Sequence, residues 1–149
     1  MTEAERVLLD SSILLYAYNP DEKEKYHVSK GLLEQGFFNN RRYYLSLQNL
    51  GEFFRVATEK MRPRVSTVIA QQIVKDFLVH PSFVKVSVTS TALELGMEIS
   101  AHNKLHFWDA LIAATMKENN IFKIYTENTK DFSKIPWLTT INPFGKSKR

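Results

Sequence analysis

The sequence predicts an α/β fold in which helices cover both faces of a central, mostly parallel sheet. Short apolar segments alternate with longer segments of helical periodicity along the chain, and such alternation is typical of parallel sheets. The 149 residues suffice for one compact domain with a sizeable core. We therefore expect a single three-layer α/β/α domain over residues 1–149, with its core at 7–144 and a frayed tail at 145–149.

The expected secondary structure follows from these alternating patterns. Five segments have the apolar or alternating pattern of strands, and they cover residues 7–9, 43–46, 84–88, 122–125 and 138–141. Six segments have the spacing of helices, and they cover residues 11–18, 19–35, 48–59, 66–80, 90–101 and 107–118. The stretch 126–137 is expected to be a loop with at most one helical turn.

Local signals mark several helix ends. Asn19 followed by Pro20 is a strong helix start, with Asn19 as the N-cap and Pro20 at the first helical position. Gly36 is the expected end of that helix. Ser66 is the expected cap of a helix whose apolar face carries Ile69, Ile73 and Phe77.

The composition excludes several classes of protein. Hydrophobic residues make up 44% and charged residues 24%, which is ordinary for a globular protein and too apolar for a disordered one. No segment approaches the roughly 18 apolar residues of a membrane span, and residues 1–6 lack the pattern of a secretory signal. The absence of cysteine excludes disulfides and thiolate metal sites, so we expect a cytoplasmic protein.

The charge is mildly basic, with 20 basic and 16 acidic residues and a net charge of +4. This balance is compatible with a nucleic-acid partner without requiring one. The basic residues cluster at Arg41 and Arg42, at Lys60, Arg62 and Arg64, and at Lys146, Lys148 and Arg149. Each cluster is equally compatible with a solvated loop or tail.

Acidic and polar residues follow the predicted strands or begin the next helices. In an open parallel sheet, ligands bind outside the carboxyl ends of the strands. The residues expected at or near that edge are Asp10, Ser46, Glu52, Asp109, Thr126, Asn128 and Asp131. Taken singly, Asp10 and Asp109 are also explained as helix caps or first-turn acids, so the argument depends on the set.

A cluster of carboxylates is costly unless something compensates it, because like charges raise one another's pKa. A divalent cation would resolve the conflict. All the candidate ligands are hard oxygens, which favours Mg²⁺ or Mn²⁺, and zinc is disfavoured without cysteine or paired histidines.

Four motifs give the chain a family resemblance. They are Leu8-Leu9-Asp10-Ser11-Ser12, the segment Leu45 to Phe53 that contains Glu52, Phe107-Trp108-Asp109-Ala110, and the segment Tyr125 to Phe132, followed by Ile141-Asn142-Pro143-Phe144. In this order the motifs resemble those of PIN-domain ribonucleases. The resemblance extends from Val7 to Phe144.

The resemblance implies a PIN fold and metal-dependent hydrolysis of RNA phosphodiester bonds. It implies catalytic and metal-binding roles for Asp10, Glu52 and Asp109, with Asp131 as a more variable fourth acid. Asn128 is a further candidate metal ligand, and whether Asn128 or Asp131 faces the metal stays open. Ser12, Ser46 and Thr126 would support the site, and the basic residues Arg41, Arg42, Lys60, Arg62 and Arg64 would hold flanking phosphates of RNA.

Many PIN proteins of this length resemble the toxin halves of VapBC-type toxin–antitoxin pairs. That likeness implies a homodimer and a cognate antitoxin. The main alternative is a PIN-type module that binds RNA or protein without catalysis. A dehalogenase-type phosphohydrolase would need an acid where Ser12 stands, and a phospho-acceptor domain would need an acid within residues 84–93, where none is present.

The remaining candidates for function receive structural interpretations. Tyr16, Tyr18 and Tyr43 are expected to pack in the core, although exposed tyrosines stack on unpaired bases in some proteins. Trp108 is also expected in the core. The four histidines are too scattered in the sequence to predict a metal site.

Overall fold

The computed structural model describes residues 5–145 of the chain. The predicted tail beyond Gly145 and the basic residues Lys146, Lys148 and Arg149 lie outside the described residues. No helix within the described part has the length and apolar character that crossing a bilayer requires.

The centre of the fold is a five-stranded sheet in the order β3-β2-β1-β4-β5. The strands are β1 (Val7–Leu9), β2 (Tyr43–Ser46), β3 (Phe83–Val86), β4 (Lys123–Tyr125) and β5 (Thr139–Ile141). Every neighbouring pair is parallel. The predicted fold class is therefore confirmed. β1 and β2 have their predicted bounds, and the ends of β3, β4 and β5 differ from prediction by at most two residues.

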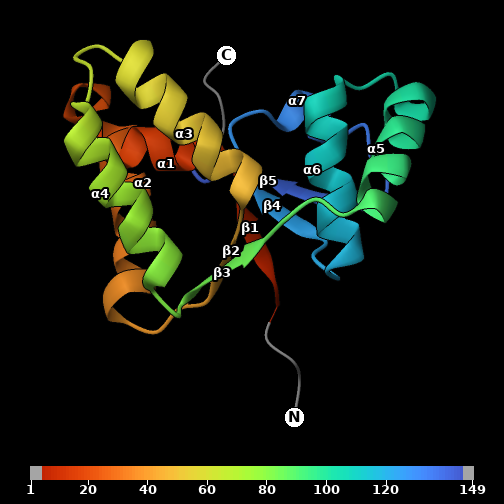
Figure 1. Cartoon of the computed structure of the whole chain (residues 1–149), viewed down its shortest axis with the longest axis horizontal. Helices are drawn as coiled ribbons and strands as arrows, with labels where there is room; N and C mark the ends of the chain where they lie inside the picture. Colours follow the sequence, from red (N-terminus) through yellow and green to blue (C-terminus); the bar gives the residue numbers. More distant parts are fainter. Residues whose placement is uncertain (1–4, 146–149) are drawn as a thin grey trace.

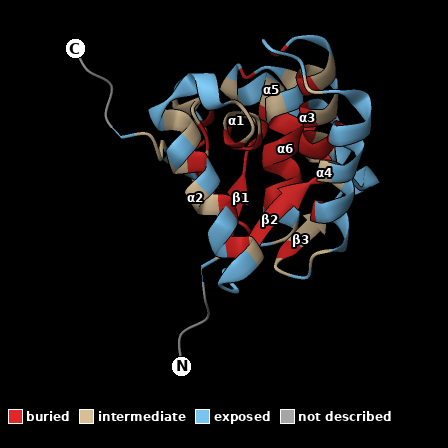
Figure 2. Ribbon diagram, turned by 90° about the vertical axis from the view of Figure 1, so that its left-hand side faces the viewer, coloured by how far each residue is buried: buried red, intermediate tan, exposed pale blue. Residues whose placement is uncertain are grey.

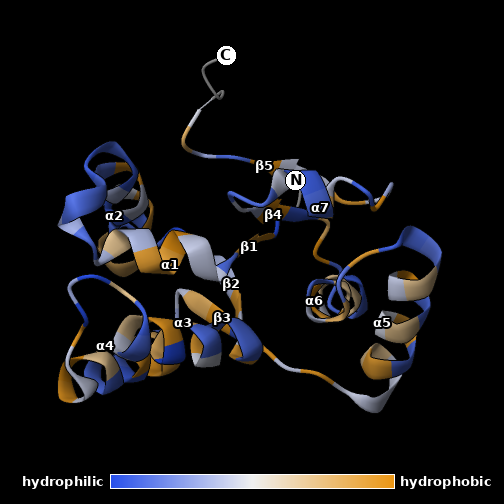
Figure 3. Cartoon of the chain, turned by 90° about the horizontal axis from the view of Figure 1, so that it is seen from above, coloured by the Kyte–Doolittle hydropathy of each residue, from blue (hydrophilic) through white to orange (hydrophobic). Residues whose placement is uncertain are grey.

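Helices cover both faces of this sheet (Figure 1). They are α1 (Ser11–Ala17), the short 3-10 helix η1 (Pro20–Glu22), α2 (Glu24–Phe38), α3 (Leu47–Glu59), α4 (Thr67–Val79), α5 (Ser90–Asn103), α6 (Phe107–Glu118) and α7 (Thr129–Phe132). Seen from above, α1 to α4 lie on one side of the strands, and α5 and α6 lie on the other (Figure 3).

Two apolar cores result, one on each face of the sheet. Val7 and Leu9 of β1 pack with α1 to α4, whereas Leu8 between them packs with α5 and α6. Successive strand residues point to opposite faces, so a short fully apolar strand feeds both cores. Figure 2 shows the result: β1, β2 and the middle of α6 are buried.

The predicted helix over residues 19–35 is wrong at both ends. The Asn19 side chain accepts a hydrogen bond from the Asp21 backbone N–H, as a cap does, but it closes only the 3-10 turn. Lys23 has a positive φ of 55°, which separates this turn from α2. Gly36 does not end α2, which continues to Phe38. Gly36 is buried, and a Cβ at this position would lie 2.5 Å from the Phe83 ring, so the absence of a side chain permits close packing of α2 on β3.

The predicted face of α4 is also partly wrong. Ser66 caps this helix as expected, and Phe77 is fully buried, but Ile69 is 57% exposed and Ala70 is buried in its place. The buried stripe is therefore rotated by one residue at the start of the helix. As a consequence, the first turn of α4 presents Val68 and Ile69 to solvent.

Candidate active site

Three strands end at the same edge of the sheet, and a residue predicted to belong to the site lies at or directly after the end of each strand. Asp10 follows β1, Ser46 ends β2, and Thr126 follows β4. The parallel register places these ends side by side, because β1 lies between β2 and β4. The Asp10 backbone N–H donates to Tyr125 O at 3.0 Å and continues the β1–β4 ladder to the site.

The Asp10 carboxylate is held on both of its oxygens. The Thr126 hydroxyl donates to Oδ2 at 2.7 Å, and the Asn49 side-chain amide donates to Oδ1 at 3.3 Å. Asn49 is itself fixed by Ser46, which caps α3 and donates to Asn49 Oδ1 at 2.8 Å. The carboxylate is therefore oriented by the ends of β2 and β4 together.

Burial changes the acidity of Asp10. This residue is only 8% exposed, and burial raises the pKa of its carboxyl group to about 6. The hydrogen bond from Thr126 opposes the increase, and the charges of Asp109 and Glu52 add to it. Desolvation of the charged form is the largest cause, as expected for a carboxylate removed from water.

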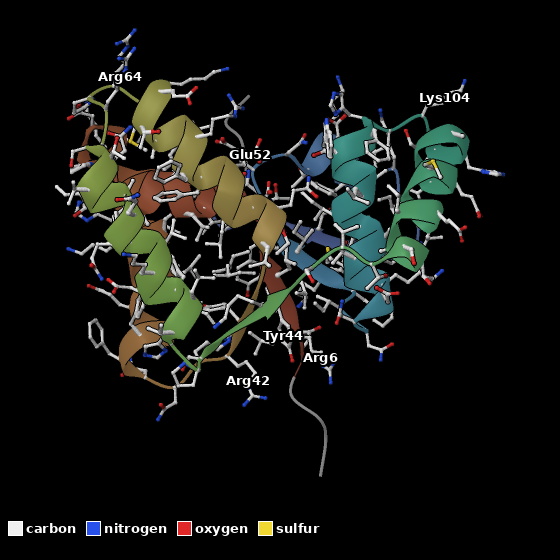
Figure 4. All side chains as sticks on the ribbon, in the orientation of Figure 1. Arg6, Arg42, Tyr44, Glu52, Arg64 and Lys104 are labelled. Atoms are coloured by element: carbon white, nitrogen blue, oxygen red, sulfur yellow. The ribbon has the colours of Figure 1, made fainter. Side chains whose placement is uncertain are left out.

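Glu52 approaches Asp10 from α3 and is tied to the same turn of the chain. Its Oε1 accepts a hydrogen bond of 2.8 Å from the Ser11 hydroxyl, and Ser11 directly follows Asp10. Figure 4 labels Glu52 on the part of α3 that lies nearest to α6. The Glu52 side chain is exposed to solvent, so it is accessible to a substrate.

Asp109 supplies a carboxylate from the first turn of α6. Burial raises the pKa of its carboxyl group, with further contributions from the charges of Asp131 and Glu52. The Asn128 side-chain amide donates to Asp109 Oδ2 at 3.4 Å. Asp131 contacts Lys134 instead, at 3.6 Å. Of the two residues left open by the sequence, Asn128 therefore contacts the acidic set directly, and Asp131 acts on it through its charge.

The donor set fits a hard divalent cation in its chemistry. Within the described residues 5–145, no three carboxylate or histidine side chains stand close enough together to surround an ion in this arrangement. The charges of Asp109 and Glu52 nevertheless raise the pKa of Asp10, and those of Asp131 and Glu52 raise the pKa of Asp109. The polar atoms around these acids are oxygens and amides. Carboxylate oxygens with room for water are the environment that Mg²⁺ and Mn²⁺ prefer.

Several site residues escaped the sequence analysis. Ser11, and not Ser12, bonds to Glu52, whereas Ser12 Oγ accepts a 3.4 Å hydrogen bond from the Glu127 backbone N–H. The role of Asn49 was also missed, although a polar residue three positions after a helix cap often bonds to that cap, here Ser46. Glu127 was also missed; it bonds to the Tyr16 hydroxyl and to Lys25.

The prediction for Trp108 was wrong. Its side chain is 56% exposed, beside Asp109 at the start of α6. The Trp108 carbonyl accepts a 3.1 Å hydrogen bond from Gln48 of α3. This contact joins the starting turns of α3 and α6. The expected packing role holds for Tyr43, which is fully buried.

The basic residues fall into two groups. Lys60 and Arg62 lie beyond the end of α3 and share a pocket with Ser12. Arg41 and Arg42 precede β2, so they lie at the opposite edge of the sheet, about 13 Å from the acids along a strand of this length. The structure therefore does not bring these two predicted RNA-binding residues to the site. Figure 4 shows Arg42 at the bottom of the molecule, and Glu52 and Arg64 in its upper half.

An all-parallel sheet with acids from β1, α3 and α6 at one edge defines a class of protein, the PIN domains. The PIN-domain family model matches residues 7–138, and the chain belongs to that family. Comparison with curated protein sequences gives no significant match.

Solved structures with the same fold include toxins and toxin–antitoxin complexes. A toxin–antitoxin complex from Klebsiella pneumoniae is 22% identical, with a TM-score of 0.63, and the match covers 92% of this chain and 97% of that one. VapBC2 from Rickettsia felis, bound to a promoter DNA fragment, is 20% identical, with a TM-score of 0.64 and coverage of 92% and 98%. VapC20 from Mycobacterium tuberculosis, a sarcin–ricin loop-cleaving toxin, is 16% identical, with a TM-score of 0.67 and coverage of 85% and 93%. At these identities the likeness establishes the fold.

Proposed function

We propose that this protein is a ribonuclease that hydrolyses RNA phosphodiester bonds with Mg²⁺ or Mn²⁺. The observation that carries the proposal is the placement of Asp10, Glu52 and Asp109 at the carboxyl edge of the sheet, where the charges of Asp109 and Glu52 reach Asp10 and raise its pKa. The PIN family membership supports it, and so does the RNA-cleaving activity described for the related fold of VapC20.

The roles of the residues follow from their positions. Asp10 and Asp109 would hold the cation, with Asn128 and Asp131 completing its surroundings directly or through water. A bound cation supplies positive charge to a phosphate oxygen and makes a nearby water more acidic. Glu52, exposed and held by Ser11, orients the attacking water and accepts its proton. Thr126 and Asn49 keep the Asp10 oxygens in place. In-line attack by water leaves a 5′-phosphate and a 3′-hydroxyl.

The test is cleavage of a panel of labelled RNAs with Mg²⁺, Mn²⁺ or EDTA, for the native chain and for Asp10→Asn. We expect cutting that requires the cation and is lost in the variant, with 5′-phosphate ends on the products. Cutting that persists in EDTA, or in a folded Asp10→Asn protein, would contradict the assignment. No cutting of any RNA would favour a PIN-type module that only binds RNA or protein.

We further propose that the protein acts in the cytoplasm as the toxin of a toxin–antitoxin pair. The support is the similarity in fold to chains found in toxin–antitoxin complexes and the absence of cysteine from the sequence. A homodimer is part of this proposal, and the exposed apolar residues Val68, Ile69, Leu78 and Val79 of α4 offer it a surface. Light scattering of the purified chain tests the dimer, and co-purification with the product of a neighbouring gene tests the antitoxin.

A further inference from the structure

A pocket of about 380 Å³ lies between α1 and the end of α3, next to the acidic site. Leu15, Val56 and Met61 form an apolar wall. Ser12, Lys60 and Arg62 supply polar and positively charged groups. A pocket of this size, with an apolar wall opposite several polar and charged groups, can accept a small molecule or a nucleotide.

Two of the residues that line the pocket are close in the chain to residues of the acidic site. Ser12 lines the pocket, and the neighbouring Ser11 bonds to Glu52. Val56 lies one helical turn beyond Glu52 on α3, and Lys60 lies one turn further, about 12 Å from Glu52 along the helix axis. An RNA strand whose scissile phosphate lies at the acidic site would therefore have its adjacent nucleotide beside the pocket.

The floor of the pocket is held in place by contacts with the site. Tyr16 lines the pocket, and its hydroxyl donates to Glu127 Oε1 at 2.5 Å. Lys25 bonds to the other Glu127 oxygen, and its ammonium group lies 5.1 Å from the centre of the Tyr16 ring. The Glu127 backbone in turn donates to Ser12. These contacts fix the pocket before any ligand enters, which lowers the entropy cost of binding.

The charged groups that line the pocket would orient a bound nucleotide. Lys60 and Arg62 are exposed cations suited to a phosphate. Glu22 and Asn19 also line the pocket, and the Glu22 carboxylate accepts hydrogen bonds. In a nucleotide only the sugar and base carry donors, so the phosphate lies toward Lys60 and Arg62 and the base toward Glu22.

We propose that this pocket is the subsite for the nucleotide that flanks the cut in single-stranded RNA. The base packs on the wall of Leu15, Val56 and Met61, and Lys60 and Arg62 hold its outer phosphate. Unpaired RNA is the fitting form, because a base must be free of its partner to enter a side pocket. The inference rests on the proposed ribonuclease function and adds the part of the substrate that positions the scissile bond.

The test measures binding of a 5′-labelled single-stranded RNA by fluorescence anisotropy in an Asp10→Asn background, where cutting is absent. The double variant Lys60→Met/Arg62→Met removes two positive charges from the pocket. The control is the double variant Arg41→Met/Arg42→Met, which removes the same charge at the opposite edge of the sheet. We expect the first pair to weaken binding about tenfold and to reduce the salt slope by about 0.7, the value for one phosphate contact on a single strand. The second pair should change affinity less than about twofold, because at 0.15 M salt charges further than about 8 Å apart are largely screened. Equal losses in both pairs, or no loss in the first, would overturn the proposal.

A second variant tests the pocket without a change of charge. Val56→Phe fills the space beside the apolar wall, and it should raise KM for RNA cleavage at least fivefold with little change in kcat. An unchanged thermal midpoint shows that the variant is folded. A folded Val56→Phe protein with the KM of the native chain contradicts the subsite, even where the native chain cuts RNA. Absence of cutting by the native chain contradicts the proposed function instead, so the two failures are distinguishable.

Discussion

Asp10→Asn should make the metal-free protein more stable at neutral pH. Asp10 is buried, and its pKa is raised to about 6 from an ordinary value of 3.8. The folded state therefore binds a proton at Asp10 more tightly than the unfolded state does. Stability falls as pH rises from about 4 to about 6, and the whole penalty is present above pH 6. An asparagine at this position carries no such penalty.

The size of the effect follows from the pKa and the hydrogen bonds. A shift of about two pKa units corresponds to about 3 kcal/mol of lost stability at pH 7. The substitution also removes one acceptor, since both Thr126 and Asn49 donate to Asp10 oxygens and an amide has one oxygen. Leaving one buried donor without its partner costs about 1–3 kcal/mol. The net gain is then at most about 2 kcal/mol, or about 6 °C in thermal midpoint for a chain of this length.

The assay is urea or thermal unfolding in EDTA between pH 4 and pH 8, for the native chain, Asp10→Asn and Glu52→Gln. The last variant is the control, because it removes an exposed acid of the same site and should change stability by less than about 0.5 kcal/mol. The native chain should lose stability between pH 4 and pH 6, and Asp10→Asn should lose much less. An Asp10→Asn protein that is no more stable than the native chain at pH 7, with the same pH dependence, would refute the reasoning.

Three further predictions use the same contacts. Mn²⁺ in EDTA-free buffer at a hundred times its Kd should stabilise the native chain by about 2.7 kcal/mol and leave the melting temperature of Asp10→Asn unchanged; equal shifts in both would place the ion elsewhere. Thr126→Val removes the donor to Asp10 Oδ2, so urea unfolding at pH 7 should show a loss of about 1–3 kcal/mol, whereas an unchanged midpoint would make that hydrogen bond unimportant. Gly36→Ala places a Cβ against the Phe83 ring and should lower the free energy of unfolding by about 1–3 kcal/mol in the same assay. An unchanged free energy would show that the ring shifts freely.

The sheet and its carboxyl edge could be predicted because both follow from local patterns. Apolar segments such as Val7–Leu9 are buried on both faces of the sheet, and this requires an all-apolar strand. The acids that follow such strands are then brought to one edge by the parallel arrangement alone. Asp10 and Thr126 were predicted on this basis, and they are in direct contact.

The details that the sequence could not provide depend on contacts between distant segments. Gly36 resembles a helix end in sequence, but its role is set by Phe83, which lies 47 residues further along the chain. Trp108 resembles a core residue until the start of α6 is placed beside Gln48. Ser11 and Ser12 are adjacent serines, and only the direction of the first turn of α1 decides which of them reaches Glu52.

The cost of the acidic site has a different main origin from the one expected from its composition. The sequence argument attributed that cost to repulsion between carboxylates, yet desolvation is the largest cause of the raised pKa of both Asp10 and Asp109, and the neighbouring charges contribute less. Burial at the end of a central strand removes Asp10 from water, while Thr126 and Asn49 hold its oxygens in one orientation. A cation bound there would replace the lost hydration of the carboxylate with its own charge. The position of Asp10 between β2 and β4 is therefore what makes it both unfavourable without a ligand and suited to bind one.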